Sequence, residues 1–246
     1  MRMSPALLTG CVLLVLMLAV SAGNAQDSSL KPVFDPWPKV EQREEHVPAK
    51  NLWLKYTVRV SDGVKHGKWT SYREDGTRAV ECWYYDGHKH GPYRMFHEDG
   101  SVYHEFEIVD GKKHGPETMW WDNGNKRFEG ENLDGYKVGT WKEWYESGQL
   151  KSQEHYEEGV LAGPHGDAKY WWESGKPKAA GRYFGSLKDG KWICWHENGQ
   201  KESEGEYQSS GRTPGEDKKV GEWKYWDEEG KLIRTEDHGK PDPNDK

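Results

Sequence analysis

One ten-residue phrase recurs seven times along this chain of 246 residues and limits its fold more than any other feature. The phrase reads Gly-x-aromatic-x-x-aromatic-x-acid-x-Gly, and two copies carry Glu117 and Ala168 in place of the first aromatic residue. Its leading glycines, separated by 24, 24, 24, 27, 24 and 31 residues, are Gly67, Gly91, Gly115, Gly139, Gly166, Gly190 and Gly221. A fixed period of this length predicts a repeat architecture, in which one supersecondary unit is stacked many times.

Each repeat is predicted to form one β-hairpin. The first strand runs from the leading glycine through the aromatic residues, and a turn such as Glu74-Asp75-Gly76 follows it. This turn pattern is typical of a type I turn that ends in a left-handed residue, which glycine adopts without strain. No segment shows a sustained helical period, and the frequent glycines disfavour long helices. The predicted fold is all-β: an elongated, single-layer antiparallel β-meander of seven hairpin repeats with an N-terminal capping strand, about 15 strands in total.

The chain is predicted to have four parts. Residues 1–25 resemble a cleaved signal peptide, because Arg2 precedes an apolar stretch and small residues precede the cleavage position; an uncleaved anchor helix and a lipid anchor at Cys11 are the alternatives. Residues 26–50 are a predicted Pro-rich linker. Residues 51–236 form the repeat domain, opened by a capping strand at 52–60 with period-two alternation, and residues 237–246 form a disordered tail. We therefore expect an exported protein, periplasmic or extracellular.

The composition indicates a core built from rings. Apolar residues make up only 33% of the chain, yet it holds 14 Trp and 13 Tyr, which bury large areas. The net charge of −7 opposes binding to nucleic acid or to an anionic membrane surface. Cys82 and Cys194 fall in the first and sixth repeats, too far apart for a disulfide within this fold. We expect two free, half-buried thiols, with a bridge between two chains as the alternative.

The repeats resemble those of a known family. The run at residues 63–76, repeated at 87–100 and 111–124, is similar to MORN repeats, in particular to the bacterial MORN variant, and the resemblance covers about residues 60–236. It implies paired strands in a twisted sheet, no catalytic residues, and a scaffold for protein contacts; some bacterial members are described as antitoxin-like. The chain departs from the pattern at 162–165 and 209–219, where residues are inserted.

No constellation for catalysis or metal binding stands out from the repeats. A ladder of histidines precedes four leading glycines, but equivalent residues in neighbouring repeats would lie about 10 Å apart and could not share one zinc ion. The chain has no nucleophile elbow, phosphate loop or metalloprotease helix motif. We therefore predict no enzyme activity, no cofactor, no metal and no small-molecule substrate.

Three doubled rings are the predicted partner-binding residues. Adjacent strand residues point to opposite faces, so each doublet places one ring on each side of the sheet. The doublets are Trp120-Trp121, Trp144-Tyr145 and Trp171-Trp172, in which Trp121, Tyr145 and Trp172 are additional to the repeat pattern. Exposed aromatic patches mark protein contact sites, so we predict a protein partner. An envelope glycan or peptidoglycan, stacked on rows of rings, is one alternative; an antitoxin or immunity role, implied by the resemblance alone, is the other.

Overall fold

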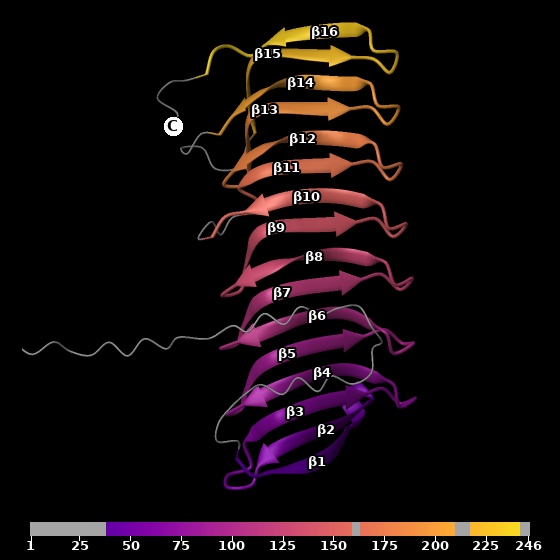
Figure 1. Ribbon diagram of the computed structural model, residues 1–246, viewed down its shortest axis with the longest axis vertical. Helices are drawn as coiled ribbons and strands as arrows, with labels where there is room; N and C mark the ends of the chain where they lie inside the picture. The colour runs from indigo at the N-terminus through magenta and orange to yellow at the C-terminus, as the bar shows by residue number, and fades with distance from the viewer. Residues whose placement is uncertain (1–37, 159–162, 210–216, 242–246) are drawn as a thin grey trace, which may run out of the picture. The chain divides into compact units, whose positions relative to one another are not determined.

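The structure, a computed structural model, describes residues 38–158, 163–209 and 217–241. In these ranges, 16 strands form one antiparallel sheet whose strand order follows the chain order (Figure 1). The one helical element in these described ranges is a 3-10 turn at Pro48–Lys50. The strands are β1 (Val40–Val47), β2 (Leu52–Arg59), β3 (Lys65–Tyr72), β4 (Arg78–Tyr85), β5 (His88–Phe96), β6 (Val102–Val109), β7 (Lys112–Trp120), β8 (Lys126–Leu133), β9 (Tyr136–Trp144), β10 (Leu150–Tyr156), β11 (Gly166–Trp171), β12 (Pro177–Phe184), β13 (Leu187–Trp195), β14 (Lys201–Gln208), β15 (Lys218–Trp226) and β16 (Leu232–Asp237). The prediction of an all-β meander of hairpins is confirmed.

The sheet begins earlier than the sequence predicted. Strand β1 pairs with β2 over eight residues, from Val40 opposite Arg59 to Val47 opposite Leu52. The predicted linker at 26–50 is therefore wrong for its last part, and the predicted capping strand is the second strand of the sheet. The predicted signal peptide at 1–25 lies outside the described residues. Among those residues, no helix has the length and apolar character needed to cross a membrane.

The turn glycines have the conformation that the sequence predicted. Gly76 has a φ of +84°, and its N–H donates to the carbonyl of Arg73 at 3.0 Å. The Asp75 carboxylate accepts from the N–H of Thr77 at 2.8 Å, which fixes the turn from its side chain. In a meander, every second connection lies at the same end of the strands. The seven turns therefore follow one another along the edge that is formed by these strand ends (Figure 1).

Six of the seven leading glycines lie in a bulge at the ends of the strands opposite to these turns; at Gly166 the pairing with the preceding strand stops before the glycine. Cys82 is paired with Tyr93, but Tyr84 is paired with Lys89, so one residue of β4 faces three residues around Gly91 in β5. Gly91 has a φ of +94°, and each of the other six leading glycines also has positive φ. Since residues with a β-carbon rarely adopt this conformation, glycine is required wherever the strand bends at the bulge.

The core of the sheet is a series of tryptophans packed on glycines. Trp141, Trp192 and Trp223 are 3–4% exposed, and each indole lies directly over a glycine of the preceding strand, Gly130, Gly181 or Gly205. Each indole N–H also donates to the carbonyl of the residue after that glycine, at 3.0–3.1 Å. We call the side of the sheet that carries these rings the aromatic face and the other side the polar face.

A row of lysines covers the rings of the aromatic face. The Lys137 ammonium lies 4.2 Å from the ring centre of Trp141, and Lys219 lies 4.4 Å from that of Trp223. Cations at this distance interact favourably with the ring quadrupole, and the lysine stem shields the ring from water. This explains how a sheet without a second layer buries tryptophan. Within the described part of the chain, Cys82 and Cys194 form no disulfide; Cys194 is half-buried as predicted, whereas Cys82 is buried.

Candidate binding surface

The net negative charge of the chain is concentrated at the edge formed by the seven turns. We call it the turn edge; it consists of residues 73–77, 97–101, 121–125, 145–149, 172–176, 196–200 and 227–231. It holds eleven acidic and three basic side chains, a net charge of −8 against −7 for the chain. The rest of the molecule is therefore close to neutral, and long-range attraction would draw a positively charged partner towards this edge.

The three predicted ring doublets lie at the strand ends beside this edge. Trp120, Trp144 and Trp171 are the last residues of β7, β9 and β11, and their neighbours open the turns. Two consecutive cations of β8 lie over rings on opposite faces of the sheet. Lys126 lies 5.9 Å from the ring centre of Trp144, and Arg127 lies 4.5 Å from that of Trp121. The predicted placement of one ring on each face therefore agrees with the geometry.

On the aromatic face, the outer member of each doublet joins its repeat to the next one. Trp121 Nε1 donates to the carbonyl of Trp144 at 3.2 Å, and Tyr145 Oη donates to the carbonyl of Trp171 at 2.9 Å. Trp172 Nε1 donates in the same way to the carbonyl of Trp195 at 3.0 Å. These three side chains are half-buried and hold successive turns in register. The repeat pattern alone did not predict this role.

On the polar face, the inner members keep their donors free. Trp120, Trp144 and Trp171 are half-buried, and in the described part of the chain their indole nitrogens form no hydrogen bond and are not enclosed. A ring with one exposed side and a free N–H can pack against an apolar group and donate to a carbonyl at once. The structure therefore separates the six predicted residues into three that join repeats and three with unused binding capacity.

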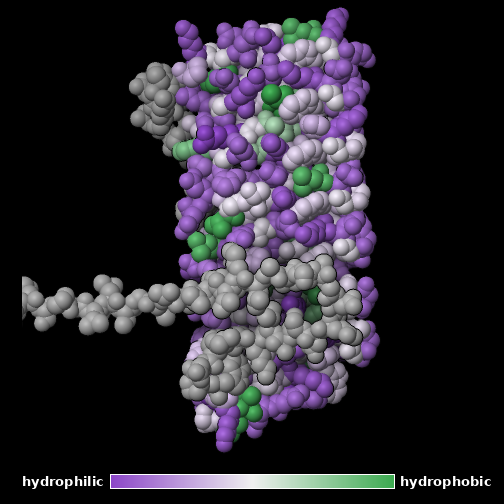
Figure 2. Space-filling view, viewed as in Figure 1, coloured by the Kyte–Doolittle hydropathy of each residue, from purple (hydrophilic) through white to green (hydrophobic). Residues whose placement is uncertain are grey.

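Hydrophilic side chains surround these rings. Figure 2 shows one face of the molecule, on which hydrophobic residues form only small, separate groups among polar ones. Charged residues of the polar face pair with one another: Glu129 pairs with Lys126 of its own strand at 2.6 Å and with Lys142 of the neighbouring strand at 4.0 Å. The surface beside the turn edge thus combines isolated rings with charge, as protein contact surfaces do.

Comparison with known families agrees with this geometry. Four segments match one family of repeats: residues 137–158, 164–183, 188–209 and 219–238. The matching family is the MORN repeat variant. Each matched MORN segment contains one leading glycine and its hairpin, so the matches correspond to the fourth to seventh repeats of the chain. The first three repeats share the phrase but lie outside the matched segments. No curated protein matches the chain.

The joining role of the turn side chains can be tested by removing one hydroxyl. Tyr145→Phe deletes the donor to the Trp171 carbonyl, and we expect it to lower the free energy of unfolding by about 1 kcal/mol, the usual net contribution of such a bond. Urea denaturation followed by tryptophan fluorescence measures this loss. Tyr136→Phe is the matched control, since Tyr136 is 48% exposed. Equal effects of the two substitutions would contradict the joining role.

Proposed function

We propose that this protein is an exported, non-enzymatic repeat scaffold that binds a protein partner through the rings beside its turn edge. The observation that carries the proposal is the row of three indoles, Trp120, Trp144 and Trp171, whose N–H groups have no partner in the described residues. Trp is strongly enriched among the residues that dominate binding energy at protein interfaces. Export is supported by the signal-like sequence at 1–25 alone.

The chemistry of the edge favours a partner segment rich in Lys or Arg. Each indole of the row is followed within two residues by a carboxylate: Asp122, Glu146 or Glu173. A guanidinium or ammonium group can stack on the ring and pair with the neighbouring carboxylate, and the negative edge raises the association rate at low salt. A partner that binds in this way dissociates more readily as the salt concentration rises.

The test is quantitative capture of the partner by matched baits. The wild-type chain and the double variant Trp144→Leu/Trp171→Leu are immobilised and exposed to an envelope fraction of the source cells, and bound proteins are quantified. We expect one enriched protein whose affinity, measured afterwards with the purified pair, falls at least 10-fold in the double variant, because ring truncations at interface centres typically cost more than 1 kcal/mol each.

The control for this experiment is an exposed tryptophan away from the row. Trp53 in β2 is 48% exposed, and Trp53→Leu should leave the affinity unchanged. Loss of binding in both variants would indicate nonspecific adhesion to rings and would contradict the proposal. Equal affinity of the wild type and the double variant would place the contact elsewhere.

Two other functions remain predictions. Retention on peptidoglycan or polysaccharide that Trp144→Leu/Trp171→Leu abolishes would favour the glycan alternative over a protein partner. The antitoxin-like role rests on the family resemblance alone. Rescue of cells from a toxin encoded next to this gene would support it.

A further inference from the structure

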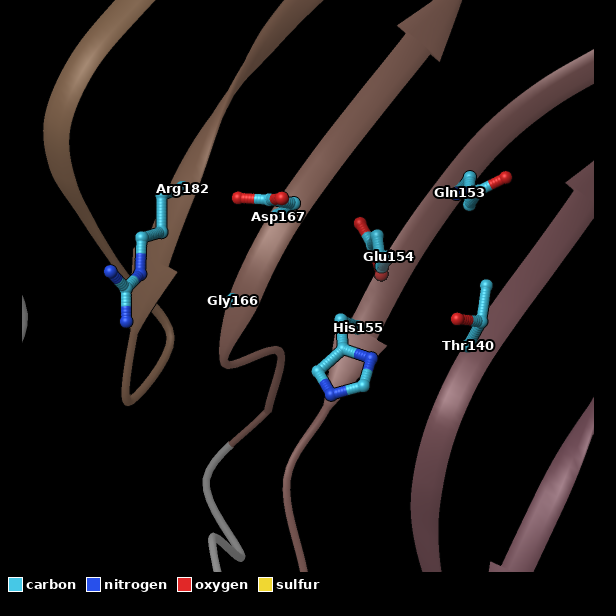
Figure 3. A pocket seen from close by; sticks show the side chains of 7 residues that line it. All are labelled: Thr140, Gln153, Glu154, His155, Gly166, Asp167 and Arg182. Carbon is cyan, nitrogen blue, oxygen red and sulfur yellow. The ribbon is translucent and has the colours of Figure 1, made fainter.

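A hollow of about 500 Å³ lies on the polar face where the repeat pattern is interrupted. It is lined by residues of four adjacent strands, β9 to β12: Thr140, Gln153, Glu154, His155, Gly166, Asp167 and Arg182 (Figure 3). Pairing between β10 and β11 covers only three residue pairs, ending at Glu154 opposite Ala168. Gly166 adds no side chain, and His155 lies so close that a β-carbon there would come within 3.1 Å of its Cδ2. The interrupted ladder and the glycine together leave the hollow open.

The register lines up four polar side chains across the hollow. Thr140 is paired with His155 between β9 and β10, and Asp167 is paired with Arg182 between β11 and β12. Gln153 lies two residue pairs nearer to the turn edge than His155 and faces Lys169, an exposed cation on the same face. Figure 3 shows these side chains arranged around one space, from Arg182 at one end to Thr140 at the other.

These lining groups have unused hydrogen-bonding capacity. In the described parts of the chain, the side chains of Thr140, Gln153, His155, Asp167 and Arg182 form no hydrogen bond, and none forms an ion pair within 4.0 Å. Glu154 differs, because its carboxylate accepts from the hydroxyls of Tyr170 at 2.5 Å and Tyr156 at 2.9 Å. Five polar side chains around one hollow therefore remain available to a ligand.

Other repeats neutralise the equivalent positions internally. Gln153 occupies a position that in four other repeats is a glutamate paired with lysine or arginine: Glu81, Glu105, Glu129 and Glu204. A second hollow of about 300 Å³ lies at the equivalent place between β13 and β15. There Lys191 and Lys201 pair with Glu204, and Lys224 pairs with Glu222 at 2.8 Å. Of the two hollows, the first is therefore the one whose charged lining residues form no ion pair with other described residues and can bind another molecule.

We infer that the hollow lined by Thr140, Gln153, His155, Asp167 and Arg182 is a binding site for a sugar acid, a small ligand with several hydroxyl groups and one carboxylate. The Arg182 guanidinium can hold the carboxylate through two parallel hydrogen bonds, and Lys169 adds positive charge beside it. Asp167 accepts two hydroxyl hydrogens, while Gln153 and Thr140 both donate and accept.

Binding of simple probes to the full chain tests this inference. The chain is titrated with sodium D-glucuronate, D-glucose and sodium acetate, and binding is followed by calorimetry and by NMR shifts of the backbone amides. We expect saturable, millimolar binding of glucuronate that is at least 10-fold tighter than that of glucose or acetate. Glucose lacks the carboxylate that Arg182 would hold, and acetate lacks the hydroxyl groups. The Gly166 and Asp167 amides should shift, and those of Gly221 and Glu222 should not.

Substitutions in the two hollows separate the site from general charge effects. Arg182→Gln should weaken glucuronate binding at least 10-fold; the side chain is exposed, and the Arg182 carbonyl still accepts from Trp192. Lys191→Gln removes a cation from the second hollow and should leave binding unchanged. Absence of saturable binding, equal affinity for glucose, or equal effects of the two substitutions would overturn the inference. None of these results bears on the protein-partner proposal, which concerns other residues.

Discussion

Gly181→Ala is expected to lower the free energy of unfolding by about 2–3 kcal/mol, although it adds only one methyl group. A β-carbon at Gly181 would overlap the indole of Trp192, which is 3% exposed and held by its hydrogen bond to Arg182. The ring cannot move away without breaking that bond and exposing its surface. Overpacking of this kind costs 1–3 kcal/mol, near the upper end where the neighbour is fixed.

A double-mutant cycle measures this contact directly. Urea denaturation gives the free energy of unfolding for Gly181→Ala, Trp192→Ala and the double variant. We expect a coupling energy of about 1–3 kcal/mol, because the clash disappears once the indole is absent. Arg182→Ala, on the same strand but exposed, is the control and should change stability by less than about 0.5 kcal/mol. Additive effects of the two core substitutions would contradict the packing argument.

The packing of Trp192 on Gly181 occurs at two other junctions between repeats as well. Trp141, Trp192 and Trp223 each follow a glycine at the facing position of the strand before them. Where that position carries a side chain, the next repeat has no tryptophan: Cys82 faces Tyr93, and Phe106 faces Glu117. At the junction between the fourth and fifth repeats, Glu154 faces Ala168 and neither position carries a ring.

The phrase repeated in the sequence predicted the hairpins, the turn glycines and the direction of the doubled rings. These features depend on local chemistry: a left-handed turn residue and the alternation of a strand. Strand β1 was missed because its residues alternate in neither polarity nor burial. Its interior, from Glu41 to His46, is exposed throughout, since an edge strand of a single sheet has one neighbour and gives no period-two signal.

The roles of the rings could be assigned only once the register of the sheet was known. Trp121 and Trp144 are 23 residues apart, and only the paired strands bring the indole of one to the carbonyl of the other. The hollow at Arg182 was invisible for a related reason: its significance lies in ion pairs that are absent there and present in other repeats. The sequence shows Gln153 where four other repeats have glutamate, but it does not show which cations pair with those glutamates, so sequence alone could not assign these roles.

The second large effect is expected at Glu117, the one leading-strand position of the described repeats where a buried carboxylate replaces the first aromatic ring. Glu117 is 4% exposed and accepts from His104 Nε2 at 2.7 Å, Asn132 Nδ2 at 2.7 Å and the Lys113 ammonium. Burial raises the pKa of this carboxyl, but the three hydrogen bonds outweigh burial and hold the pKa at about 2, below its ordinary 4.5. The ionised form is therefore the one that the fold stabilises.

The pH dependence follows from the direction of this pKa shift. A carboxyl whose pKa is lower in the folded state contributes its stability fully above its unfolded pKa, here about 4.5, and loses it as the pH falls through about 2. The difference between these two pKa values corresponds to about 3 kcal/mol in the free energy of unfolding. Glu117→Gln should thus destabilise the protein by about 3 kcal/mol at pH 7, and the gap to the wild type should narrow as the pH falls from 5 to 2.

Denaturation of both proteins at a series of pH values measures this gap. Glu105→Gln is the matched control, because Glu105 pairs with Arg94 in the same region of the sheet but its side chain is 43% exposed. An exposed pair contributes at most about 1 kcal/mol, so this variant should follow the wild type at every pH. A gap between Glu117→Gln and the wild type that stays constant from pH 7 to pH 2 would show that the buried carboxylate acts through its shape and not through its charge.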